Sequence, residues 1–123
     1  MAKTLLAIGA IMGALAVAIG AFGAHGLEGR VSERMMENYQ TGVQYHMFHS
    51  LGIIVVGLTA AVIGGSALLG WAGSLMFFGM IVFSGSLYTM ALTGMTWLGA
   101  ITPIGGVAFI LGWILLMIAA LRI

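Results

Sequence analysis

The stretch Tyr39–Gly52, YQTGVQYHMFHSLG, stands at the start of a long apolar run, and the rest of the chain can be interpreted outward from it. Most of the chain is apolar, yet this stretch contains Gln44, Tyr45, His46 and His49. Polar side chains at membrane depth are costly unless they find partners, so they indicate a functional site. The stretch therefore predicts a helix that enters a membrane with polar groups in its first turns.

The composition excludes a soluble surface. Hydrophobic residues make up 62% of the 123 residues and charged residues only 6%, whereas soluble domains carry about 25% charged residues. A molecule with so few charges needs lipid as its main solvent. The net charge of +1 offers no basic patch to nucleic acid. The absence of cysteine excludes disulfides, thiolate catalysis and cysteine-based metal sites.

Four apolar runs are each long enough to cross a bilayer, which takes about 20 residues. We expect spans near residues 4–24, 41–63, 69–92 and 101–121, with a short amphipathic helix at 28–40 lying on the membrane surface. The two later connections are short, which makes successive helices antiparallel. The sequence predicts one all-α membrane domain, residues 1–123, folded as an antiparallel four-helix bundle with both termini on one side.

The segments between the spans carry helix signals. Ser32 is a candidate N-cap for the amphipathic helix, in which Arg34 and Glu37 stand at a pairing distance. Gly64-Gly65 and Thr93-Gly94 end the second and third spans. The alternative for the polar segment is an ordinary solvated loop.

The first span is rich in small residues. Gly9 and Gly13 have GxxxG spacing, and Ala10, Ala14 and Ala18 form a second line. Small residues let helices approach closely in lipid, so we expect a packing face and a homo-oligomer or an accessory subunit of a larger membrane complex. The alternative is a cleaved signal peptide, but the run exceeds the ~7–15-residue core of such a peptide, so we expect a retained helix.

Aromatic residues mark the expected membrane boundaries. Trp71, Trp97 and Tyr39 lie near predicted span ends and suit the interfacial belts, whereas Trp113 lies inside a span and does not.

The charged residues give little indication of the orientation of the chain in the membrane. Lys3 and Arg122 stand on the terminal side, against Arg30 and Arg34 on the loop side. The free amino terminus favours termini in the cytoplasm.

In this topology the uncommon polar side chains meet in the half of the bundle nearer the polar loop. That half holds the end of the first helix, the start of the second, the end of the third and the start of the fourth. The candidates for a polar pocket are His25, Gln44, Tyr45, His46, His49, Ser84, Ser86, Tyr88 and Thr102. The other half is dominated by apolar residues and glycine.

Three interpretations of this cluster stay open. In the first, the side chains hydrogen-bond between helices, which contributes about 0.6 kcal/mol per bond in a membrane. In the second, they line a cavity for a small molecule, a lipid head group or a permeating solute. In the third, His25, His46 and His49 bind a metal or haem. An HxxH spacing alone is weak, and no carboxylate in the spans supports the histidines.

Four segments resemble a known family. They are GAFGAHGL at 20–27, QYHMFH at 44–49, FSGSLY at 83–88 and LGAITPIGG at 98–106. In these motifs the chain resembles the YgdD/YwdK-like family of small bacterial membrane proteins of unknown function, although Gly26 stands where alanine is more usual. The resemblance implies a multispanning protein of the cytoplasmic membrane and implies no activity.

We expect a non-enzymatic packing or interaction protein with a polar pocket on the loop side, without catalytic residues or cofactors. The alternatives are a small channel or transporter and, less favoured, a histidine-based metal or haem site. The expected partners are the lipid bilayer and further copies of the chain, not nucleic acid.

Overall fold

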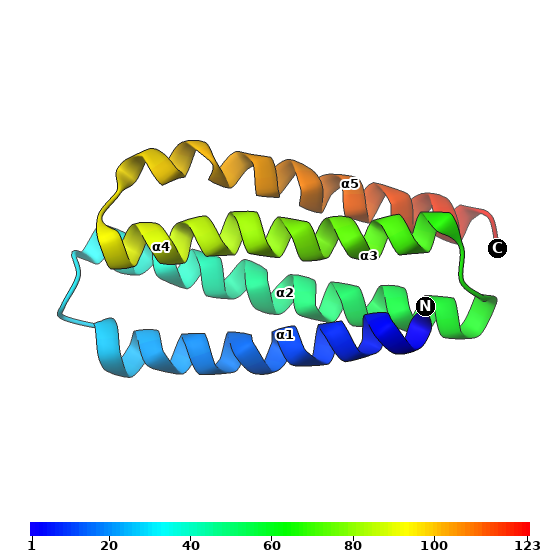
Figure 1. Ribbon diagram of the computed structural model, residues 1–123, viewed down its shortest axis with the longest axis horizontal. Coiled ribbons are helices and arrows are strands. Elements are labelled where there is room, and N and C mark those ends of the chain that lie inside the picture. Colours follow the sequence, from blue (N-terminus) through cyan, green and yellow to red (C-terminus); the bar gives the residue numbers. More distant parts are fainter.

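The computed structural model describes residues 1–123, and its long helices run back and forth along one axis (Figure 1). The elements are α1 (Ala2–Phe22), the π-helical η1 (Gly23–Leu27), α2 (Glu33–Ile63), α3 (Ala67–Gly79), the π-helical η2 (Met80–Ser84), α4 (Gly85–Thr93), the 3-10 helix η3 (Thr96–Ala100) and α5 (Thr102–Leu121). The segments α3, η2 and α4 form one rod, and η3 continues into α5. The result is four helices long and apolar enough to cross a membrane, which confirms the expected all-α architecture. Both termini lie at the same end (Figure 1).

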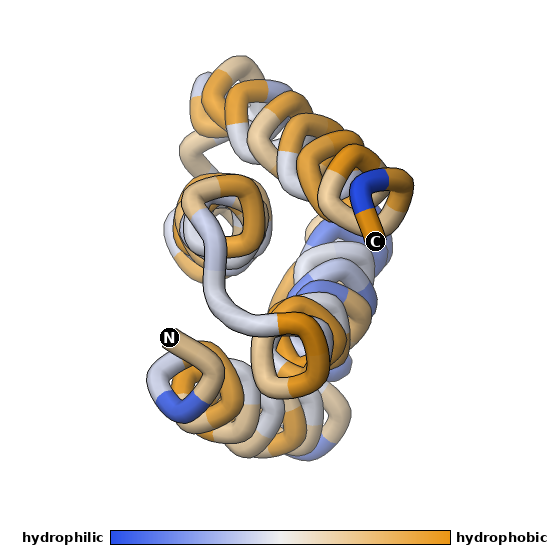
Figure 2. Tube along the Cα trace, turned by 90° about the vertical axis from the view of Figure 1, so that its right-hand side faces the viewer, coloured by the Kyte–Doolittle hydropathy of each residue, from blue (hydrophilic) through white to orange (hydrophobic).

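Viewed end-on, each helix packs on the next one in chain order, and α1 and α5 lie at opposite edges of the molecule (Figure 2). Helix α1 packs along α2, α2 packs on the α3–α4 rod, and α5 packs along α3 and η2. The backbones of helices α2 and α5 stay farther apart, and aromatic side chains from both helices meet between them. We call the side on which these two helices face each other the α2–α5 seam.

Helix ends follow local backbone chemistry. The Ser32 hydroxyl accepts a hydrogen bond from the Met35 backbone N–H at 3.2 Å, which confirms the expected N-cap of α2. Ser66 caps α3 in the same way through the Leu69 N–H. Gly94 ends α4 with φ at +76°, a conformation that residues with a Cβ adopt at a cost.

The polar segment after the first span joins the second span without a break. Residues 33–40, expected as a separate surface helix, form the first turns of the 31-residue helix α2. No proline intervenes, and Gly42 lies inside the continuous helix, where its missing Cβ leaves room for the Tyr88 ring. At about 1.5 Å per residue, α2 exceeds the ~30 Å hydrocarbon core, so its first turns can still extend to the membrane surface. Tyr39, expected at the interface, is instead 2% exposed.

The terminal half of the molecule is packed with apolar side chains. Its largest cluster includes Ile53, Val56 and Leu69, all fully buried. Helix α1 approaches α2 closely at Gly9, where an added Cβ would lie 3.0 Å from the Ser50 carbonyl oxygen. Such close approach through small residues is typical of helices in lipid. The line of Ala10, Ala14 and Ala18 faces outward.

Candidate functional site

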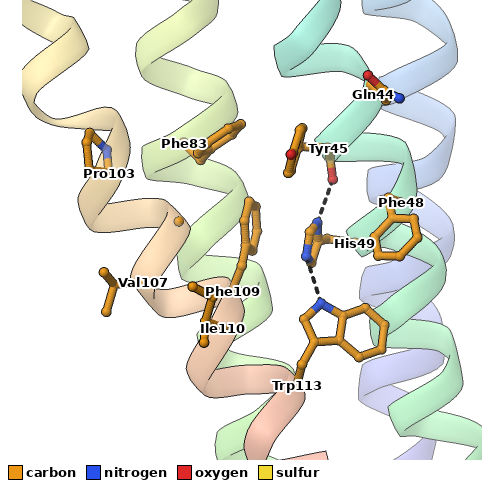
Figure 3. A pocket seen from close by; sticks show the side chains of 11 residues that line it. Gln44, Tyr45, Phe48, His49, Phe83, Pro103, Val107, Phe109, Ile110 and Trp113 are labelled. Atoms are coloured by element: carbon orange, nitrogen blue, oxygen red, sulfur yellow. Dashed lines mark hydrogen bonds between the residues drawn. The ribbon is translucent and has the colours of Figure 1, made fainter.

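A cavity of about 680 Å³ lies in the α2–α5 seam (Figure 3), and we call it the seam cavity. Its size is within the range of small-molecule sites, about 300–1,000 Å³. It is lined by Gln44, Tyr45, Phe48 and His49 of α2, Phe83 of η2, and Pro103, Gly106, Val107, Phe109, Ile110 and Trp113 of α5. No charged residue is among them.

The π-helical segment η2 positions one wall of the cavity. At Gly105 an added Cβ would lie 2.5 Å from the Phe83 backbone nitrogen, so α5 rests directly on the η2 backbone. The Phe83 ring then stands 4.6 Å from the Tyr45 ring and 5.4 Å from the Phe109 ring, centroid to centroid. Short π-helical segments inside helices are frequent at functional sites.

His49 forms the inner wall, and the chain satisfies both of its ring nitrogens. The Trp113 indole N–H donates to His49 Nε2 at 3.0 Å. An indole nitrogen can only donate, so Nε2 accepts and the ring proton resides on Nδ1. Nδ1 then donates to the Tyr45 carbonyl oxygen at 2.8 Å (Figure 3). His49 is thus a neutral imidazole held in one tautomer.

Stacking holds the same imidazole in its plane. The His49 ring lies parallel to the Phe109 ring, with centroids 3.5 Å apart and planes 9° apart. His49 has 3% of its surface exposed, so these contacts enclose almost the whole side chain.

Free hydrogen-bonding groups occur at the rim of the cavity. The Tyr45 hydroxyl and the Gln44 amide have no hydrogen-bond partner within the chain. Tyr45 is 42% exposed and Phe48 59% exposed, so the rim opens on the outer surface of the helices. The cavity thus combines an apolar aromatic interior with polar groups at its edge.

A second set of the predicted residues lies apart from the cavity, between α2 and the segment formed by η2 and α4. His46 Nδ1 and the Tyr88 hydroxyl are hydrogen-bonded at 2.9 Å, and the Ser84 hydroxyl donates to the Gly42 carbonyl at 2.7 Å. Tyr39 packs on Tyr88 with ring centroids 5.1 Å apart. His46 Nε2 is buried without a hydrogen-bond partner. His46 and His49 are therefore three residues apart, but His46 contacts α4 and His49 contacts α5.

The remaining candidates occupy other places. The Ser86 and Thr102 hydroxyls are hydrogen-bonded to each other at 2.6 Å and link α4 to the start of α5. His25 lies in η1 and is exposed. Of the nine predicted pocket residues, Gln44, Tyr45 and His49 line the seam cavity.

Comparison with known proteins agrees with the resemblance in the motifs. The family model described as "Protein of unknown function (DUF423)" matches residues 19–106. The chain belongs to this family. It is 50% identical over 120 residues to the UPF0382 membrane protein YwdK of Bacillus subtilis (strain 168), covering 98% of both chains. It is also 50% identical to the UPF0382 membrane protein SERP0230 of Staphylococcus epidermidis, covering 98% of this chain and 97% of the relative. No solved structure matches it.

In this DUF423 protein the three histidines do not converge. No group of three His, Cys, Asp or Glu side chains is arranged to hold a metal ion. His49 already uses both ring nitrogens, and His25 lies outside the helix interfaces. The donor set that the third interpretation needs is therefore not assembled.

The aromatic lining was not anticipated from this DUF423 sequence. Phe48, Phe83, Phe109 and Trp113 resemble ordinary apolar residues of a span. One signal was present: Trp113 lies inside a span, where a buried indole N–H needs a hydrogen-bond acceptor. A histidine on a neighbouring span was the natural candidate for that acceptor.

Proposed function

We propose that this protein is a non-catalytic membrane protein that binds a bilayer lipid in the seam cavity. The observation that carries the proposal is the lining, which is aromatic and uncharged inside and offers free polar groups at its rim. An acyl chain matches such an interior because neither side loses hydrogen bonds on contact.

The rim supports entry from the bilayer. Val107 and Ile110 of α5 are 56% and 60% exposed, and Phe48 on the α2 side is equally accessible. In a chain of this composition these outward side chains face lipid. A ligand dissolved in the bilayer can therefore reach the cavity sideways between α2 and α5.

The packing of the other half favours binding over permeation. Below the cavity, Ile53, Leu69 and Met76 are fully buried in the apolar cluster. A channel needs a polar or hollow path across the whole membrane. We therefore propose a bound lipid in place of a passing solute.

Native mass spectrometry tests the proposal. The protein is reconstituted with dioleoyl phosphatidylcholine, extracted in mild detergent and weighed with what it retains. Gly106 lines the cavity, and its added Cβ would only meet Phe83 at 3.9 Å, so Gly106→Leu fills the cavity without forcing the helices apart. We expect the wild type to retain a lipid and Gly106→Leu to lose it.

The matched control is Gly85→Leu. An added Cβ at Gly85 meets nothing within 4 Å, and the residue lies outside the cavity. This variant should retain lipid as the wild type does. Equal retention by the Gly106 and Gly85 variants would refute the proposal.

We further propose that the protein resides in the cytoplasmic membrane as a homo-oligomer or as part of a larger complex. The outward alanine line of α1 supports self-association, because small residues permit close helix contact. The same mass spectra report the number of subunits, and a purely monomeric mass would contradict the homo-oligomer.

A further inference from the structure

A second cavity of about 570 Å³ lies at the loop end of the molecule, among the start of α2, the end of α4 and η3. We call it the loop-end cavity. It is lined by Arg34, Met35, Asn38, Leu87, Met90, Thr96, Gly99 and Thr102. Unlike the seam cavity, it contains a charged group.

That group is an unpaired cation. Arg34 makes no ion pair or hydrogen bond within the chain, and the expected pairing with Glu37 is not formed. The cavity also presents the Asn38 amide and the Thr96 hydroxyl. A guanidinium beside neutral polar groups suits a phosphate, which guanidinium binds with two parallel hydrogen bonds.

The lining residues of the two cavities follow one another along α2 and along the segment from η3 into α5. At about 100° per residue, the seven α2 residues that line the two cavities fall on one half of the helix, and positions 34, 38, 45 and 49 fall within roughly 60° of one another. Thr96, Gly99 and Thr102 of the loop-end cavity come just before Pro103 and Gly106 of the seam cavity. Along α2 and along the segment from η3 into α5, the residues of the loop-end cavity therefore come before those of the seam cavity. Arg34 lies toward the membrane surface, and the aromatic rings lie deeper.

The spacing corresponds to one leaflet of a bilayer. Arg34 and His49 are 15 positions apart, which corresponds to about 22 Å along α2. Half of a bilayer with its head groups measures about 20–22 Å. A single lipid can thus place its head group at Arg34 and its chain against His49.

We infer that the loop-end cavity binds the phosphate head group of an anionic phospholipid whose acyl chain occupies the seam cavity. This inference rests on the proposed function. It specifies in addition that the lipid is anionic and that its head group lies on the loop side. The head group is held by Arg34 at the loop side, and the chain points toward the termini.

The test is lipid competition read by native mass spectrometry. The protein is reconstituted with equal amounts of dioleoyl phosphatidylglycerol and dioleoyl phosphatidylcholine, and the ratio of the two retained lipids is measured. We expect the wild type to prefer the anionic lipid and Arg34→Gln to reduce this preference about fivefold, the effect of one basic residue at a membrane surface. Gly99→Leu, whose added Cβ meets nothing within 4 Å, should fill the cavity and reduce the preference equally.

The control is Arg30→Gln, which removes the same charge from the loop but not from the cavity lining. It should keep the wild-type preference. An equal loss in Arg30→Gln and Arg34→Gln would overturn the inference, because the preference would then come from general surface charge. Displacement of the lipid by soluble glycerol 3-phosphate would overturn it too, because free phosphate would then be the ligand.

The two proposals fail in different ways. Loss of the anionic preference in Arg34→Gln with unchanged total lipid retention supports the head-group site. An unchanged preference in Arg34→Gln overturns that site and leaves the seam cavity intact. Unchanged total retention in Gly106→Leu overturns lipid binding itself.

Discussion

At the scale of single residues, one histidine is explained completely by its neighbours. His49 accepts from Trp113, donates to the Tyr45 carbonyl and stacks on Phe109. A neutral, buried and fully paired imidazole is a structural group, and in this chain it shapes the wall of a cavity. His46, hydrogen-bonded to Tyr88 through one nitrogen only, has no such complete set of partners.

We predict a measurable coupling between His49 and Trp113. A double-mutant cycle with His49→Leu and Trp113→Phe, read as the free energy of unfolding in bicelles, should give about 0.6 kcal/mol, the mean for interhelical bonds in a membrane. The magnitude is small because the unfolded chain in lipid also finds hydrogen-bond partners. Trp97→Phe is the control, since Trp97 is 62% exposed and makes no hydrogen bond. A coupling with Trp113 no larger than with Trp97 would contradict the bond.

At the scale of elements, the contact between α5 and η2 forms one wall of the seam cavity. The π-helical turn brings Phe83 into the wall, and Gly105 lets α5 approach the Phe83 backbone. Backbone atoms cannot move aside as a flexible side chain can. The close approach of α5 to the η2 backbone therefore requires a residue without a Cβ at position 105.

We predict that Gly105→Ala destabilises the protein although alanine favours helix. The new Cβ would meet the Phe83 nitrogen at 2.5 Å and its Cα at 2.8 Å, and overpacking of this kind costs about 1–3 kcal/mol. Thermal unfolding in detergent measures the effect. Gly85→Ala, with open space around its Cβ, should leave the protein as stable or slightly more stable. If both variants melt together, α5 does not rest on η2 as described.

At the scale of the whole molecule, the polar loop between α1 and α2 and the two termini lie at opposite ends of the helix bundle (Figure 1). The apolar cluster fills the terminal end, and both cavities lie toward the loop end. A bound lipid would therefore belong to the leaflet on the loop side. Which side of the membrane this leaflet occupies follows from the orientation of the chain.

We predict that the loop and the carboxyl terminus label from opposite sides of the membrane. Because the chain has no cysteine, Glu28→Cys and Arg122→Cys each introduce a single reactive thiol. A membrane-impermeant maleimide applied to intact cells should label one variant and spare the other. We expect Glu28→Cys to be labelled, as termini in the cytoplasm require. Labelling of both variants from one side would contradict the four-span topology.

The sequence by itself determined the class of the protein and the approximate places of its four spans, but not that residues 33–40 continue into the second span. The length of the four apolar runs predicts four spanning helices, because a backbone that crosses lipid must satisfy its hydrogen bonds within a helix or a closed barrel. Local chemistry also placed the helix ends, as at Ser32 and Gly94, because capping depends on neighbouring residues. The concentration of polar residues near the loop end followed from topology alone.

Only the tertiary structure decided which of these residues belong together. Residues 46 and 49 share a helix side in sequence, yet one pairs with α4 and the other with α5, because helix rotation depends on packing against all neighbours. The π-helical turn at 80–84 and the placement of α5 on Gly105 depend on contacts between residues distant in sequence. The aromatic cavity follows from those contacts, and no local pattern of apolar residues contains that information.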